Sequence, residues 1–271
     1  MISNKDSYRY ELFDTSILFR KGLFDNYIDV VYILTMENST RRNDYMEQIK
    51  KYNPHSKIII QHNKGFKKCT KQLYKQNTIH DLNDAYYHAF LHAKSNNYND
   101  ILIFEDDFFF DRVKNEDIHE IGMFIKNNDY HIYNLGPGIN ISIPHTLKHH
   151  LSIISTCSHG VIYNMKYFDF YINKYNEGFN LMCDNVWNQF DIIKYKYYKQ
   201  ICFQTFPITE NIKNWPFSKI AIFFIKIMNL DKSHQPGFTI LNILGYLVPI
   251  IVLVLYLWFT NLFYSKLGNG I

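Results

Sequence analysis

Four large apolar residues, Ile101 to Phe104, run directly into three consecutive carboxylates, Glu105, Asp106 and Asp107. A short continuous apolar run bounded by polar residues is typical of a strand that is buried on both faces of its sheet. In an open α/β sheet, ligands bind beyond the carboxyl ends of the strands, which is where these carboxylates would lie. The sequence therefore predicts an α/β fold with a polar site at the end of this strand.

The carboxylate triplet itself points to a cation. Three adjacent carboxylates repel one another and raise one another's pKa, so a bound cation stabilises them. Mg²⁺ and Mn²⁺ prefer oxygen ligands, commonly one or two carboxylates together with phosphate oxygens of a substrate. The triplet therefore indicates a metal–diphosphate site. The alternative is an acidic turn that follows a core strand.

Shorter apolar runs and helical patterns alternate along the rest of the chain. This alternation predicts an α/β domain with a largely parallel central sheet. We expect the domain to occupy residues 29–216, after an N-terminal extension over residues 1–28. The further predicted strands are 29–34, 57–61, 130–135 and 160–163, and the predicted helices include 81–94 and 165–173.

The C-terminal part of the chain is strongly apolar, with no Lys, Arg, Asp or Glu from Ser233 to Ser265. A bilayer core requires about 20 apolar residues in a helix. The sequence therefore predicts a transmembrane helix over residues 238–264, which would make the protein tail-anchored in a single pass. A buried core helix is the alternative.

Basic residues flank this apolar stretch unevenly. Lys219, Lys226 and Lys232 precede it and Lys266 follows it, so the positive-inside rule places the main domain in the cytoplasm. The segment 217–232 alternates aromatic and aliphatic residues and predicts an interfacial amphipathic helix, with an ordinary packed helix as the alternative.

Overall charge and cysteine usage narrow the class of protein. The formal net charge is only +4, with 29 basic and 25 acidic residues scattered along the chain, so we expect no nucleic acid partner. The four cysteines, Cys69, Cys157, Cys183 and Cys202, lie far apart without a CxxC motif. We interpret them as free thiols in a reducing compartment, with a pair of disulfides as the alternative.

Several motifs occur in a recognisable order over residues 29–215: Val31–Leu34 followed by Arg41 and Arg42, the helix 81–94, the acidic triplet, Tyr133–Gly136, Thr156–Tyr163, and Asp184 near Trp187. This order resembles glycosyltransferase family twenty-five, the lipopolysaccharide-biosynthesis type that also contains collagen galactosyltransferase domains. The chain has Asn83–Ala85 with His88 where that family has a Ser-His pair, so the resemblance is to a divergent member.

The resemblance implies a nucleotide-sugar-binding fold of the GT-A type with a Mn²⁺ or Mg²⁺ cofactor. It assigns Asp107 as the direct metal ligand, with Glu105 or Asp106 contacting the ribose or reaching the metal through water. Arg41 and Arg42 become candidates for contacts with the diphosphate or the base, because a guanidinium offers paired donors to phosphate oxygens. Their alternative role is a solvated first turn of a helix.

Inverting sugar transfer also requires a general base that deprotonates the acceptor hydroxyl. Asp184 is the candidate catalytic residue, and Trp187 could offer an apolar face to a sugar ring. His159, beside Gly160, could contact the donor or the acceptor. The alternatives are a capping role for Asp184 and a structural role for His159.

The sequence thus predicts a metal-dependent glycosyltransferase of the hexosyltransferase type. It would move a sugar from a nucleoside-diphosphate sugar to a glycan, protein or lipid acceptor at a membrane. Two alternatives stay open. The protein could be a membrane-anchored non-catalytic scaffold or sugar-binding protein with the same fold, or a metal-dependent nucleotidyl- or phosphotransferase.

Overall fold

The computed structural model describes residues 4–18, 20–178, 186–189, 191–206, 210–213, 215 and 217–268. The strands are β1 (Tyr8–Asp14), β2 (Val30–Met36), β3 (Lys57–Asn63), β4 (Asp100–Glu105), β5 (Phe108–Phe110), β6 (Ile132–Asn134), β7 (Asn140–Pro144), β8 (His149–Ser155), β9 (Gly160–Asn164), β10 (Lys194–Tyr197) and β11 (Cys202–Gln204). The α-helices are α1 (Arg42–Tyr52), α2 (Thr78–Ser95), α3 (Asn115–Asn127), α4 (Met165–Glu177), α6 (Glu210–Lys213), α7 (Ser218–Ile227) and α8 (Gly237–Gly268). Short 3₁₀ turns, η1 (Asn4–Ser7) and η2 (Thr15–Leu18), flank β1.

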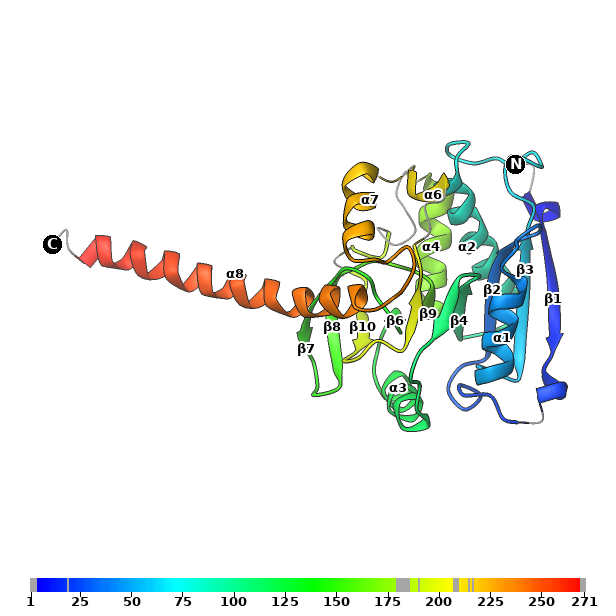
Figure 1. Ribbon diagram of the computed structural model, residues 1–271, viewed down its shortest axis with the longest axis horizontal. Coiled ribbons are helices and arrows are strands. Elements are labelled where there is room, and N and C mark those ends of the chain that lie inside the picture. Colours follow the sequence, from blue (N-terminus) through cyan, green and yellow to red (C-terminus); the bar gives the residue numbers. More distant parts are fainter. Residues whose placement is uncertain are drawn as a thin grey trace.

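A nine-stranded sheet in the order β1-β3-β2-β4-β9-β6-β10-β8-β7 forms the centre of the described domain, and α8 projects from one side of it (Figure 1). The pairs β3–β2, β2–β4 and β6–β10 are parallel, whereas β1, β8 and β9 run against their neighbours. The predicted α/β class is confirmed. The sheet is mixed and not largely parallel as predicted, because β9 in its middle runs antiparallel to both β4 and β6 and the parallel pairs lie on either side of it.

Helices cover both faces of this sheet, as the continuous apolar strands require. On β4, Leu102 and Phe104 pack on the face that also holds buried side chains of α1 and α3. Ile101 and Ile103 point to the opposite face, where they meet buried side chains of α2 and α4. Alternate residues of one strand therefore enter two separate cores, which is why the four positions between Asp100 and Glu105 are all apolar.

The strand β1 adds an edge to the sheet from within the predicted N-terminal extension. It pairs antiparallel with β3 along its whole length, from Tyr8 opposite Asn63 to Asp14 opposite Lys57. Charged side chains such as Arg9 and Glu11 stay partly or fully exposed on it, as is usual for an edge strand. Residues 8–14 therefore belong to the folded domain.

A second, two-stranded sheet joins β5 to β11 directly after the acidic triplet. A third apolar cluster forms beside it from Phe203 and Phe206 with Ile225 of α7 and Phe238 of α8. The C-terminal helices are thus packed against the segments that immediately follow β4 and β10.

Candidate functional site

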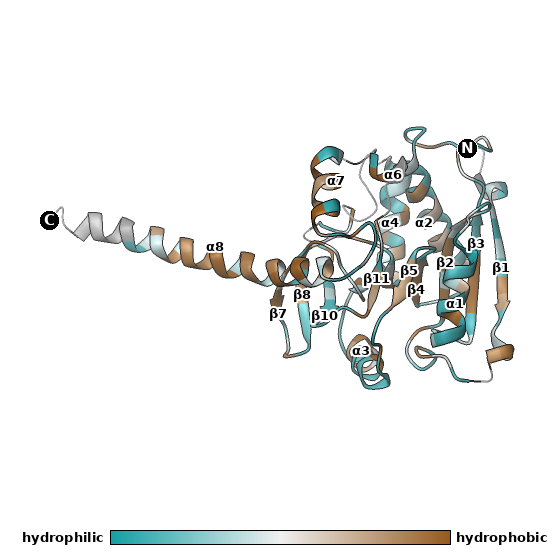
Figure 2. Cartoon of the chain, viewed as in Figure 1, coloured by the Kyte–Doolittle hydropathy of each residue, from teal (hydrophilic) through white to brown (hydrophobic). Residues whose placement is uncertain are grey.

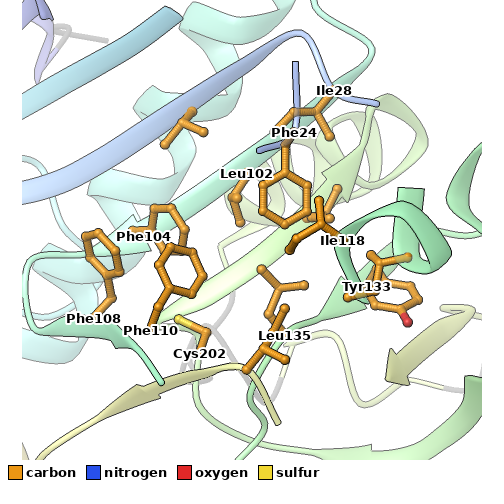
Figure 3. Close-up of a cluster of buried hydrophobic side chains, with 14 of the residues drawn as sticks. Phe24, Ile28, Leu102, Phe104, Phe108, Phe110, Ile118, Tyr133, Leu135 and Cys202 are labelled. Carbon is orange, nitrogen blue, oxygen red and sulfur yellow. The ribbon is translucent and has the colours of Figure 1, made fainter. Parts of the chain in front are cut away.

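The acidic triplet forms a tight turn between β4 and β5 that is closed by stacked aromatic rings. Phe104 precedes the turn and Phe108 follows it, and their ring centroids are 4.0 Å apart. Phe110 packs edge-on against both rings, and Figure 3 shows these three side chains grouped near Cys202. The buried rings fix both ends of the turn, so Glu105 and its two neighbours project at the carboxyl edge of the sheet.

Asp106 is held by donors from the end of β2 and from the loop that follows it. Its Oδ2 accepts hydrogen bonds from Thr35 Oγ1 at 2.7 Å and from Ser39 Oγ at 2.6 Å. Its Oδ1 accepts from Arg41 Nη1 at 2.9 Å. The carboxylate oxygens of Asp106 are therefore already engaged by protein donors, which makes this residue a link between the two strand ends.

Asp107 has a different environment. Its Oδ2 lies 3.3 Å from Arg41 Nη1, while its Oδ1 is buried and accepts no hydrogen bond from the described residues. Burial, followed by the nearby charge of Glu105, raises the pKa of Asp107 to about 7, although the Arg41 guanidinium opposes this rise. A carboxylate with a raised pKa and an unpaired oxygen favours the binding of a cation or a proton.

Glu105 is oriented from two further elements. Its Oε1 accepts hydrogen bonds from Tyr86 Oη of α2 at 3.1 Å and from Ser158 Oγ, just before β9. The position of Ser158 follows from the ladder, because Phe104 pairs with Gly160 and the Glu105 amide donates to the His159 carbonyl. The pairing of β9 with β4 therefore brings the Ser158 hydroxyl next to the acidic triplet.

Thr35, Ser39, Tyr86 and Ser158 were not among the predicted site residues. Thr35 stands near the end of β2 as Glu105 stands at the end of β4, and these two strands are parallel neighbours. Thr35 could have been predicted as a site residue, because the carboxyl ends of neighbouring parallel strands lie at the same edge of a sheet. Tyr86 lies in the middle of an apolar helix face, where the sequence pattern predicts only packing.

The two adjacent arginines differ sharply. Arg41 lies in the site and contacts both Asp106 and Asp107, and these carboxylates raise its pKa against the effect of burial. Arg42 points instead to Glu11 on the edge strand, at 3.2 Å, with half of its side chain exposed. Of the predicted pair, Arg41 alone joins the acidic triplet.

His159 and Trp187 are both buried side chains. His159 is fully enclosed, its Nε2 lies 3.3 Å from the Cys202 carbonyl oxygen, and burial lowers its pKa to about 4. Trp187 is fully buried, stacks on Tyr163 and donates its indole N–H to the Ser155 carbonyl oxygen at 3.0 Å. Neither side chain presents the open face that the sequence led us to expect, because both fill the core.

The predicted general base, Asp184, lies outside the described residues, and so does Cys183. The other three cysteines, Cys69, Cys157 and Cys202, are free thiols.

A second polar cluster lies at the same edge, beyond β3. The fully buried Lys71 ammonium donates to Asp81 Oδ1 at 2.6 Å and lies 3.7 Å from Asp84 Oδ2. Tyr8 Oη donates to Asp84 Oδ2 at 2.6 Å, and Lys71 also donates to Tyr8 at 2.8 Å. A hollow of about 420 Å³ adjoins this cluster and is lined by residues 66–71 and Gln76. The cluster connects β1, β3 and α2, because Lys71 also donates to Asn63 of β3. The positive charge of Lys71 balances part of the negative charge of the two carboxylates.

The donor set at the triplet suits a hard divalent cation. Asp107 Oδ1 offers an unpaired oxygen beside the carboxylate of Glu105, and oxygen is the ligand that Mg²⁺ and Mn²⁺ prefer. In the described ranges, no three His, Cys, Asp or Glu side chains lie together so that they could hold a metal ion without other ligands. The remaining ligands would have to be substrate phosphates and water, as is usual for Mg²⁺.

Comparison with known proteins leaves the family of this chain open. No family model and no curated protein sequence matches it. Among solved structures, a nucleoside-diphosphate-sugar pyrophosphorylase from Vibrio cholerae RC9 aligns with a TM-score of 0.32 and 12% identity, over 62% of this chain and 72% of that one. Similarity at this level supports no inference about fold or activity.

The C-terminal helix fits the predicted membrane span. Residues Gly237–Asn261 of α8 form a helix that is long and apolar enough to cross a membrane. Their side chains are apolar along most of the projecting length (Figure 2).

Proposed function

We propose that this protein is a membrane-anchored, metal-dependent glycosyltransferase that uses a nucleoside-diphosphate sugar as donor. The observation that supports it best is the state of Asp107, a carboxylate just beyond the carboxyl end of β4 with an unpaired buried oxygen and a raised pKa. The resemblance of the motif order to glycosyltransferase family twenty-five supplies the reaction type.

In this proposal a bound Mn²⁺ or Mg²⁺ supplies charge stabilisation for the departing nucleoside diphosphate. Asp107 and Glu105 would hold the cation, and Tyr86 and Ser158 orient the Glu105 carboxylate by hydrogen bonds. Asp106 positions Arg41, whose guanidinium is directed toward the same edge and can bind a phosphate oxygen. Asp184 would take the proton of the acceptor hydroxyl as its oxygen attacks the anomeric carbon and the bond to the nucleoside diphosphate breaks. This single displacement would invert the configuration of that carbon. The α8 helix would anchor the domain, and the excess of lysines before this helix favours a cytoplasmic domain.

The non-catalytic alternative is favoured by the ion pairs of Arg41 with Asp106 and Asp107. They balance part of the acidic charge without a metal. A scaffold of this kind would bind no nucleotide in a metal-dependent way.

The test is hydrolysis of a panel of nucleotide sugars by the purified full-length protein in detergent, with and without Mn²⁺. Release of one nucleoside diphosphate, dependent on metal and lost in Asp107→Asn, supports the proposal. The matched control is Asp111→Asn, which changes a nearby carboxylate that pairs with His234 outside the triplet. Absence of release from every donor, with acceptor mixtures added and the fold verified, would favour the scaffold. Formation of nucleotide sugar from a sugar phosphate and a nucleoside triphosphate would instead indicate a nucleotidyltransferase.

A further inference from the structure

Helix α7 has an apolar surface on two sides, and one of these sides is largely exposed. Toward the domain, Ile225 is buried with Phe206, Leu230 and Phe238, and Ile222 and Met228 pack against this cluster. This inner face is enough to dock the helix. The outer face needs a separate explanation.

The outer face is a continuous apolar stripe. Four of its five members lie within α7 at spacings of three, one and three positions, so they share one side of the helix, and the fifth immediately precedes the helix. Each has between about half and four fifths of its surface exposed: Phe217, Ile220, Phe223, Phe224 and Ile227. An exposed stripe of large apolar residues marks a site of contact with a partner or a membrane.

Charge restricts what this stripe can contact. Lys219 and Lys226 are exposed beside it, and residues 217–230 contain no Asp or Glu. A second copy of the chain that packed symmetrically through α7 would bring the same lysines together, because a two-fold contact uses the same patch twice. An apolar face with flanking lysines matches instead the boundary between acyl chains and anionic headgroups.

The position of α7 relative to α8 also points to a lipid surface. Leu230 and Phe238 pack together just after α7 and at the start of α8. Figure 1 shows α7 at the side of the domain from which α8 leaves, and running across the direction of α8. A helix that crosses the axis of a membrane-spanning neighbour lies along the membrane plane.

The first turns of α8 contact the domain. These contacts indicate where along α8 the membrane begins. Lys196 Nζ donates to Asn242 Oδ1 at 2.6 Å, and Tyr246 Oη donates to the Tyr198 carbonyl oxygen at 3.2 Å. At Gly245 the helix touches β7 so closely that a Cβ would lie 1.8 Å from the Asn140 carbonyl oxygen. The helix leaves the domain after this point, and residues 247–268 extend over about 33 Å, close to the thickness of a bilayer core.

We propose that the outer stripe of α7 lies in the headgroup region of the bilayer that α8 crosses, with Lys219 and Lys226 at the level of anionic headgroups. This inference rests on the membrane anchoring included in the proposed function and is independent of the enzymatic activity. The domain would then contact the membrane through two helices at a fixed orientation.

The test uses the full-length protein in vesicles of phosphatidylcholine and phosphatidylglycerol whose acyl chains carry bromine at defined depths. Phe223→Trp introduces a fluorophore on the stripe, and Met123→Trp, at an exposed position of α3, is the matched control. We expect bromine near the top of the acyl chains, about 5–10 Å below the headgroups, to quench the added emission of Phe223→Trp and to leave that of Met123→Trp unchanged. The wild-type protein supplies the background emission of its own tryptophans.

Equal quenching of the two variants would overturn the inference. So would emission of Phe223→Trp that depends on the protein-to-lipid ratio and not on bromine, which would indicate a second copy on the stripe. Flotation of the protein with vesicles after a carbonate wash is measured in parallel. Loss of flotation would reject the anchoring by α8, whereas retained flotation without quenching would reject only the placement of α7.

Discussion

Replacement of Asp107 by asparagine is a direct test of the electrostatics at the acidic turn. Asparagine has nearly the same shape as the protonated side chain and carries no charge. In the folded protein the pKa of Asp107 is about 7, because burial and the charge of Glu105 oppose ionisation. One pKa unit corresponds to about 1.4 kcal/mol, so ionising Asp107 costs the folded state about 4 kcal/mol relative to the unfolded chain.

The direction of the pH dependence follows from this difference. The folded protein holds the Asp107 proton more tightly than the unfolded chain does. The contribution of Asp107 to the free energy of unfolding is therefore full below about pH 4 and falls as the pH rises to about 7. His149 and His159, whose pKa values burial lowers to about 4, act in the opposite direction over much of this range. They are present in both proteins, so their effect cancels in the difference between variant and wild type.

The assay is urea-induced unfolding of wild type and Asp107→Asn in detergent with EDTA, at pH 4 and pH 7.5. We expect nearly equal stability at pH 4 and a variant that is more stable than wild type by up to about 4 kcal/mol at pH 7.5. Mn²⁺ should raise the stability of the wild type at pH 7.5 and leave the variant unchanged. A variant that is no more stable than wild type at pH 7.5 would refute the argument that the ionised carboxylate is destabilised.

Four further variants test other contacts by their unfolding free energies. Arg41→Met should lower stability by about 3–5 kcal/mol, since it removes the guanidinium that pairs with both Asp106 and Asp107, whereas Arg42→Met should change it by less than about 1 kcal/mol because its ion pair is exposed. Equal effects of the two substitutions would contradict the assigned geometry. Lys71→Met removes the buried ammonium that pairs with two carboxylates and should cost about 3–5 kcal/mol; a loss below about 1 kcal/mol would contradict this pairing. Gly136→Ala should destabilise by about 1–3 kcal/mol because the added Cβ would lie 1.6 Å from the Cys202 carbonyl oxygen, and unchanged stability would show that these two segments are not in contact.

The sequence was informative where burial alone determines structure. The apolar runs of β2 and β4 predict strands covered on both faces, and the two core clusters on opposite sides of the sheet confirm this. The reversed direction of β9 could not be derived in the same way. It depends on the pairing of this strand with β4 and β6, which no local pattern specifies.

The strand β10 shows how polar residues conceal a buried element. Its sequence, Lys194 to Tyr197, resembles a half-exposed strand, yet all four positions are buried. The lysine ammonium groups reach the Trp187 carbonyl oxygen and the Asn242 side chain, and burial lowers the pKa of each lysine to about 8. These partners come from other segments, so alternation along the strand did not reveal them.

The candidate site was predicted only in part for a similar reason. The acidic triplet and Arg41 were identified from their residue types. The assignment of Asp106 as a substrate contact did not anticipate that Thr35 and Ser39 bind its oxygens from 71 and 67 positions away. Hydrogen bonds over such separations require the fold, because spacing along the chain does not encode them.

The stacked pair Phe104 and Phe108 determines how the acidic turn can respond to a ligand. Because both ends of the turn are fixed by buried rings, the carboxylates between them are preorganised, and a ligand that binds there has little loop to order. The affinity of the turn for a cation is then governed by the balance between two opposed charges, the acidic triplet and Arg41. A substrate phosphate that draws the guanidinium away from the carboxylates would strengthen the attraction for the cation, so that donor and metal would bind with positive cooperativity.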